Sequence, residues 1–200
     1  MIKNNKFKLI LSSIFILSPI LVGLIFWNEL PYQMATHWGL DGTINDLSSK
    51  AFAIFGLPLI LFVIHWVCIF FTSRDPKNKN QNKKALDMVL WILPITSIFS
   101  NGIVYATAFG KEANIKSTVV LLLGIMFIFL GNYMPKCKQN YTMGIKIKWT
   151  LVSEENWNAT HRFAGKLWVI GGLLIIACIF LPDYIVPWFL AVFIVILGRI

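Results

Sequence analysis

Two reactive side chains lie inside an otherwise apolar run, where intramembrane chemistry would be expected. His65 and Cys68 are three residues apart and share one face of a helix. Catalysis there needs a second acid or base, and a metal site needs further ligands. The apolar runs hold no Asp, Glu or second His. The sequence therefore predicts no enzyme, metal or cofactor, and leaves His65 as a ligand- or proton-sensing group or a neutral histidine hydrogen-bonded between helices.

A second set of polar and aromatic residues follows the first apolar run. His37, Trp38, Asp41 and Gly42 lie close together, and the glycine permits a turn with positive φ. Tryptophan is suited to the membrane interface. The set is either a structured turn between two helices or an external surface that binds a ligand.

A third set occupies the longest stretch between apolar runs, residues 131–165. Ser153 is placed to cap a helix whose first turn holds Glu154 and Glu155. Residues 157, 161 and 164 then share one face, which predicts a short amphipathic helix on the membrane surface. The stretch either anchors itself at the interface or docks a partner. Its candidate docking residues are Asn132, Pro135, Asn140, Gly144, Trp149, Thr150, Ser153, Trp157, Thr160 and His161.

The elements that hold these residues are predicted to be membrane helices. The 200-residue chain is 57% hydrophobic and only 14% charged, which is too few charges to coat a soluble domain. In lipid, backbone polar groups must be paired internally, and a spanning helix takes about 20 residues. The sequence predicts an all-α polytopic protein, one membrane domain over residues 1–200. Its six helices are expected at 9–27, 51–71, 88–109, 118–134, 163–181 and 184–198.

The basic residues predict the orientation. Of 18 Lys and Arg, all but Lys50, Lys111 and Lys116 lie at the termini or in and beside the second and fourth loops. Since cytoplasmic segments are rich in Lys and Arg, both termini and the loop 131–165 are predicted inside a bacterial plasma membrane, and the loop 28–50 outside. The net charge of +9 then reflects contact with lipid and not nucleic acid. The basic segment 74–84 is predicted to be a solvated linker.

Two of these stretches resemble the SdpI family, bacterial immunity proteins against the sporulation-delaying toxin. The first is Leu30-Pro31, His37-Trp38, Gly42, Lys50 and Pro58. The second, more specific stretch is Gly131-Asn132, Pro135, Asn140, Gly144-Ile145-Lys146, Trp149-Thr150-Leu151, Ser153, Trp157, Thr160-His161 and Gly165-Lys166. Lys148 stands where the family usually has proline. Together the stretches reach over residues 25–175.

The resemblance implies a membrane immunity protein that protects its cell from a secreted peptide toxin. It also implies a toxin receptor that sequesters a cytoplasmic repressor at the membrane. On this basis the outer residues His37, Trp38, Asp41 and Gly42 would contact toxin. The alternative from the residues themselves is a small-molecule or ion transporter or channel, because Pro19, Pro58 and Pro94 could break helices around a path.

Overall fold

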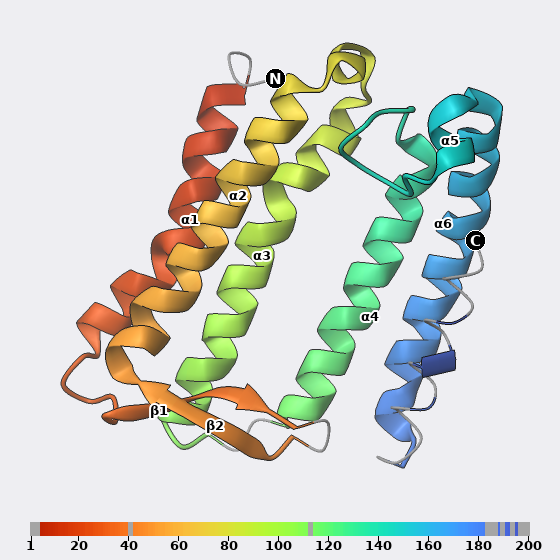
Figure 1. Ribbon diagram of the computed structural model, residues 1–200. Helices are drawn as coiled ribbons and strands as arrows, with labels where there is room; N and C mark the ends of the chain where they lie inside the picture. The colour runs from red at the N-terminus through yellow and green to blue at the C-terminus, as the bar shows by residue number, and fades with distance from the viewer. Residues whose placement is uncertain are drawn as a thin grey trace. The chain divides into compact units, whose positions relative to one another are not determined.

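Helices make up most of the chain in the computed structural model, which describes residues 5–39, 42–111 and 114–182, with 188, 191–192 and 195. The long helices are α1 (Lys6–Ile25), α2 (Leu57–Arg74), α3 (Lys83–Ala108), α4 (Ile115–Tyr133) and α6 (Glu154–Ala177) (Figure 1). The short elements are β1 (Gln33–Trp38), β2 (Ile44–Ser49), η2 (Phe52–Gly56), η3 (Pro76–Asn80), η4 (Met134–Lys136), α5 (Lys148–Val152) and η5 (Cys178–Phe180).

Five helical stretches among the described residues are long and apolar enough to cross a membrane. They are Lys6–Ile25, Phe52–Arg74, Lys83–Ala108, Ile115–Lys136 and Glu154–Phe180. Large apolar side chains such as Ile10, Leu21 and Val63 are exposed on them, as contact with lipid requires. The helical membrane class is confirmed. The sixth predicted helix, 184–198, falls almost entirely outside the described residues.

Two elements differ from the sequence-based expectation. The residues predicted for a separate surface helix are instead the first turns of α6, because no Gly or Pro interrupts residues 154–164 and the helix propagates. The loop 28–50 contains an antiparallel hairpin of β1 and β2, from Gln33 opposite Ser49 to Trp38 opposite Ile44. The all-α prediction did not include this hairpin.

The contacts divide the chain into two compact units. One is Met1–Ser73 with Asp87–Ile115, and the other is Arg74–Leu86 with Lys116–Ile200. In the first unit, α1, α2 and α3 pack with the hairpin around two apolar clusters. Their buried members are Leu30, Met34, Ala53, Ile54, Val104 and Tyr105, and Leu9, Ile69 and Leu90.

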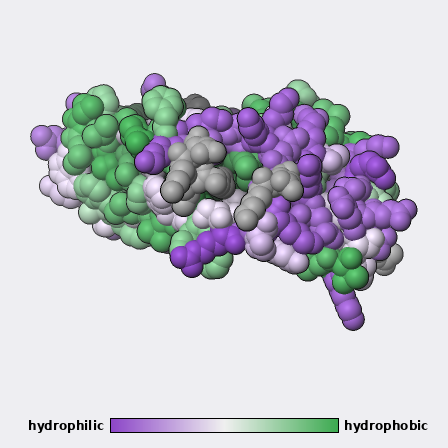
Figure 2. All heavy atoms as spheres, turned by 90° about the horizontal axis from the view of Figure 1, so that it is seen from above, coloured by the Kyte–Doolittle hydropathy of each residue, from purple (hydrophilic) through white to green (hydrophobic). Residues whose placement is uncertain are grey.

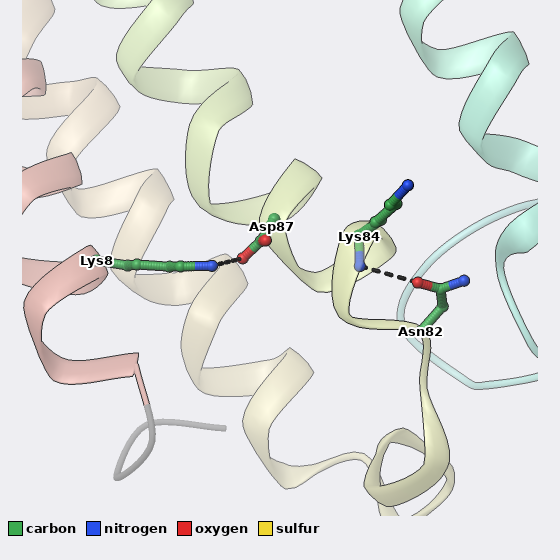
Figure 3. A network of polar contacts seen from close by, with 4 residues as sticks. All are labelled: Lys8, Asn82, Lys84 and Asp87. Carbon is green, nitrogen blue, oxygen red and sulfur yellow. Dashed lines mark hydrogen bonds and ion pairs between the residues drawn. The ribbon is translucent and has the colours of Figure 1, made fainter.

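Polar contacts fix the beginnings of α1 and α3. Lys8 Nζ lies 2.6 Å from Asp87 Oδ1, which joins the first turn of α1 to α3 (Figure 3). Figure 3 also shows the Asn82 side chain accepting a hydrogen bond from the Lys84 N–H at 2.9 Å, which caps the start of α3.

Pro19 inside α1 has no N–H, so a carbonyl one turn earlier loses its helical partner. The Ser18 hydroxyl donates to that carbonyl, of Phe15, at 2.9 Å. From α3, Ser97 donates to the Ile16 carbonyl at 2.8 Å and Tyr105 donates to the Pro19 carbonyl at 2.7 Å. The proline is therefore buried, and the carbonyls around it accept hydrogen bonds from α1 and α3.

In the second unit, α4 and α6 approach through paired glycines. A Cβ on Gly124 would lie 2.7 Å from the Gly172 carbonyl, and one on Gly131 would lie 2.7 Å from the Gly165 carbonyl. Each pair is seven residues from the next, so both lie on one seam of the two helices. Small residues allow membrane helices to pack backbone against backbone, and this seam fixes where the fourth loop, residues 131–165, begins and ends.

Candidate functional site

The centre of the fourth loop is built from two side chains of α6. Trp157 and His161 are one turn apart and stack with ring centroids 4.0 Å apart. Trp157 is fully buried and His161 is 1% exposed. The Trp157 indole N–H donates to the Cys137 carbonyl at 2.8 Å, which brings the beginning of the loop onto α6.

The hydrogen bonds of His161 define its protonation. Nδ1 lies 2.8 Å from the Trp157 carbonyl and therefore carries the hydrogen. Nε2 then accepts from the Ile145 N–H at 3.0 Å. Both ring nitrogens are satisfied in the neutral tautomer, whereas a second proton would point at the Ile145 N–H. His161 is thus a structural acceptor for the loop backbone.

The turn before Ile145 depends on Asn140 and Gly144. Asn140 is fully buried, and its Oδ1 accepts from the backbone N–H of Thr142 at 2.8 Å and of Met143 at 2.6 Å. Gly144 has φ +94°, and a Cβ there would collide with the His161 ring. Only glycine therefore fits at this position.

The short helix α5 is held by Thr150. Its hydroxyl donates toward the carbonyls of Ile145 and Ile147, both at 2.9 Å, and accepts from the Ile147 N–H at 3.0 Å. Gln139 donates to the Thr150 carbonyl at 2.7 Å. Ser153 then caps α6 by accepting from the Asn156 N–H at 3.2 Å, which confirms the predicted cap.

Segment 75–81, within the predicted linker 74–84, packs on this loop. Asp75 is 7% exposed, and its Oδ2 accepts from the Tyr141 N–H at 2.7 Å and from Thr142 Oγ1 at 3.0 Å. Gln81 accepts from the Lys138 N–H and donates to the Lys138 carbonyl, both at 2.9 Å. The prediction of a solvated linker is wrong for these residues. Asp75 before Pro76 is a usual helix start and was the available signal.

The predicted docking residues divide by exposure. Asn140, Thr150, Trp157 and His161 are buried, and Gly144 faces the His161 ring. Asn132, Pro135 and Trp149 are exposed, while Ser153 and Thr160 are partly buried. Figure 2 looks onto the end of the second unit that carries this loop, and shows mainly hydrophilic side chains there. Lys136, Lys138, Lys146 and Lys148 are exposed and make this surface basic.

The hairpin in the first unit holds the other predicted set. His37 is exposed in β1 opposite Asp46, whereas Trp38 packs against the apolar cluster that contains Met34. Gly42 has φ +85° and closes the turn by donating to the Gly39 carbonyl at 3.0 Å. Asp41 lies outside the described residues.

Lys50, at the end of the hairpin, is held by aromatic groups. Its Nζ donates to the Trp27 carbonyl at 2.8 Å and lies 5.3 Å and 5.2 Å from the ring centroids of Trp27 and Tyr32. The cation therefore caps the C-terminal end of α1, where the helix dipole favours positive charge.

His65 is fully buried in the first unit. Its Nε2 lies 3.0 Å from Ser12 Oγ, which also lies 3.0 Å from the Leu9 carbonyl. If the serine donates to that carbonyl, the histidine donates to the serine and Nδ1 keeps its lone pair. Among the described residues, Nδ1 has no partner, and no three His, Cys, Asp or Glu side chains group to hold a metal.

Cys137 is buried beneath segment 75–81, and burial raises the pKa of its thiol to about 11, against a weaker opposing effect of a hydrogen bond from Asn140. At pH 8 this leaves about a hundredfold less reactive thiolate than an ordinary cysteine carries. This thiol's contribution to stability is present below about pH 9 and is lost as pH rises through 11.

We therefore expect Cys137 to resist alkylation at pH 8. The measurement is the rate of N-ethylmaleimide addition in a protein with Cys68→Ser and Cys178→Ser, before and after unfolding in detergent. Unfolding should accelerate the reaction about a hundredfold, since it restores an ordinary thiol. Equal rates in both states would contradict the described burial.

Comparison with known proteins agrees with the motif resemblance. Residues 136–200 match the model of the SdpI/YfhL protein family, and residues 14–62 match a domain of unknown function. The chain is 27% identical over 187 residues to the immunity protein SdpI of Bacillus subtilis (strain 168), covering 90% of this chain and 85% of that protein. No solved structure matches the chain. The resemblance to the SdpI family is confirmed.

Proposed function

We propose that this chain is a membrane immunity protein that protects its cell from a secreted peptide toxin. The observation that carries the proposal is the similarity to an immunity protein over 90% of the chain, which includes both motif regions. The fourth-loop motif supports it, because its residues form one interconnected core of hydrogen bonds and not a set of unrelated contacts. Binding is the proposed mode of action.

The proposed orientation puts both termini and the fourth loop in the cytoplasm and the hairpin outside. The distribution of Lys and Arg supports it. Toxin would then contact the hairpin, where His37 is exposed on β1 opposite Asp46 of the paired strand. Trp38 would support this surface from below, since it packs on the apolar cluster.

The test of the function uses the cell that makes this protein. Deleting the gene should make that cell sensitive to its own spent culture medium, and restoring the gene should restore growth. A deletion strain that grows normally in spent medium would contradict the immunity role.

The same assay tests the hairpin. We expect His37→Ala to lower the tolerated dose of spent medium several-fold while the amount of membrane-inserted protein stays normal, because an exposed side chain carries little stability. The matched variant Asn45→Ala changes an exposed side chain of β2, where Asn45 accepts a hydrogen bond from Thr43, and should have little effect on protection. Full protection by the His37 variant would remove this residue from the toxin contact.

We also propose the finer role suggested by the resemblance, a toxin receptor that holds a repressor at the membrane. Of the predicted docking residues, Trp149 is exposed and Thr160 partly so, while Trp157 and His161 are buried beneath the loop. We therefore propose that docking would use Trp149 and the lysines around it, which would attract an acidic partner surface. The buried pair would act by shaping that surface.

A further inference from the structure

Segment 75–81 meets the fourth loop through polar contacts. Besides the bonds of Asp75 and Gln81, Lys77 Nζ donates to Gln139 Oε1 at 2.6 Å, and Asn78 donates to Thr142 Oγ1 at 3.1 Å. The partners lie within residues 137–142, so four residues of the segment bond to five residues of the loop. Polar contacts of this kind exchange readily with water, whereas an apolar contact does not.

Asp75 is the most connected residue of the segment. Its Oδ1 accepts from the Lys77 N–H at 2.9 Å and so begins η3, while Oδ2 accepts the two bonds from Tyr141 and Thr142. One carboxylate therefore shapes its own segment and holds the loop. Burying a carboxylate costs free energy unless such bonds are made. If they are lost, the free energy therefore favours separation of segment 75–81 from residues 137–142.

The segment is also placed where the chain passes between its two compact units. The division falls between Ser73 and Arg74 on one side and between Leu86 and Asp87 on the other. Asp75 follows the last residue of α2 directly, and Gln81 comes two residues before α3 begins at Lys83. The segment is therefore joined to α2 directly and to α3 through one residue, Asn82.

We propose that Asp75 is a positioning residue that closes segment 75–81 on residues 137–142 as a latch, and that opening this latch uncovers the turn of the fourth loop to solvent. The surface uncovered includes Cys137, whose sulfur accepts from Gln81 Nε2 at 3.8 Å, and the buried Asn140.

Cys137 provides the test, because it lies under the latch. The full chain in its native membrane, with Cys68→Ser and Cys178→Ser, is treated with N-ethylmaleimide, and the rate of Cys137 modification is measured. Asp75→Asn keeps the side-chain shape but leaves one acceptor oxygen in place of two, so either the Lys77 N–H or the Tyr141 N–H loses its acceptor. We expect the rate to rise about tenfold or more, since a charged carboxylate that accepts on both sides becomes a neutral amide that accepts on only one. Thr142→Val removes the bonds that Thr142 Oγ1 makes to Asp75 and accepts from Asn78 but leaves the Tyr141 bond, and should raise the rate about threefold.

Two controls separate a latch from general loosening. Glu29→Gln makes the same change of a carboxylate to an amide on an exposed residue of the first unit and should leave the rate unchanged. A second series retains only Cys178, which is 1% exposed at the far end of α6. Its rate should not respond to Asp75→Asn.

The proposal is overturned if Asp75→Asn leaves the Cys137 rate within twofold of the parent, or if Cys137 and Cys178 accelerate together. If the Asp75→Asn protein does not accumulate, Thr142→Val is the test. An unchanged rate of Cys137 modification in that variant also overturns the proposal. No toxin or partner enters the assay, so its failure leaves the proposed immunity role standing.

Discussion

Replacing Gly165 by valine should prevent α4 and α6 from packing, and little folded protein should be recovered. A Cβ at this position would lie 2.7 Å from the Gly131 carbonyl and 2.9 Å from the Pro135 ring, so there is no flexible side chain to move aside. Overpacking of this kind costs about 1–3 kcal/mol for a few added carbons, and a backbone clash belongs at the upper end. Gly165→Ala should show a smaller loss in the same direction.

The measurement is the yield of monodisperse protein in detergent together with its melting temperature. Gly102→Ala is the matched control, because a Cβ at Gly102 meets nothing within 4 Å in the middle of α3. It should melt at or slightly above the parent temperature, since alanine favours helix over glycine. If Gly165→Val melts like the parent, the close α4–α6 seam is wrong.

Truncating Trp157 should be the most damaging single change within the fourth loop. The side chain is fully buried, stacks on His161 and donates to the Cys137 carbonyl. Trp157→Ala should cost about 3–5 kcal/mol of stability, as for other large core aromatics. Trp157→Phe keeps an aromatic ring but loses the N–H. It should lower stability by about 1 kcal/mol for the lost hydrogen bond, with a further loss from the smaller ring.

Trp149→Ala is the control for Trp157→Ala, because it truncates a tryptophan of the same loop that is exposed. Trp149 is 54% exposed on α5, and its loss should change stability by no more than about 0.5 kcal/mol. Denaturant or thermal unfolding in detergent gives all three values. A large effect at Trp157 and a small one at Trp149 would show that the first stabilises the loop and the second belongs to its surface. Equal and small effects of both alanine variants would contradict the buried core.

Features that depend on neighbouring residues were predicted well. Ser153 caps α6 as expected, because a cap needs only the residues that follow it. Trp157 and His161 were placed on one face from their spacing, and they stack. The spanning helices followed from runs of apolar residues. Each of these features depends on the spacing of residue types over a short stretch of sequence.

Features that depend on distant partners were not predicted. Asp75 bonds Tyr141 and Thr142, 66 and 67 residues away, and nothing in the local pattern indicates that pairing. The burial of Trp157 depends in the same way on Cys137. The hairpin was missed for another reason: its strands are short and β2 is exposed along nearly its whole length, so the alternation that marks a strand is absent.

The continuity of α6 has a mechanical consequence. With 24 residues at 1.5 Å each the helix is about 36 Å long, which is more than the roughly 30 Å of the hydrocarbon core. The stacked pair that organises the fourth loop is therefore carried on the same stiff rod that crosses the bilayer. A tilt of about 10° about one end would displace the other by about 6 Å, by the length of such a rod. Because the loop is attached at the end of this helix, a small change in tilt would move the loop far more than the middle of α6.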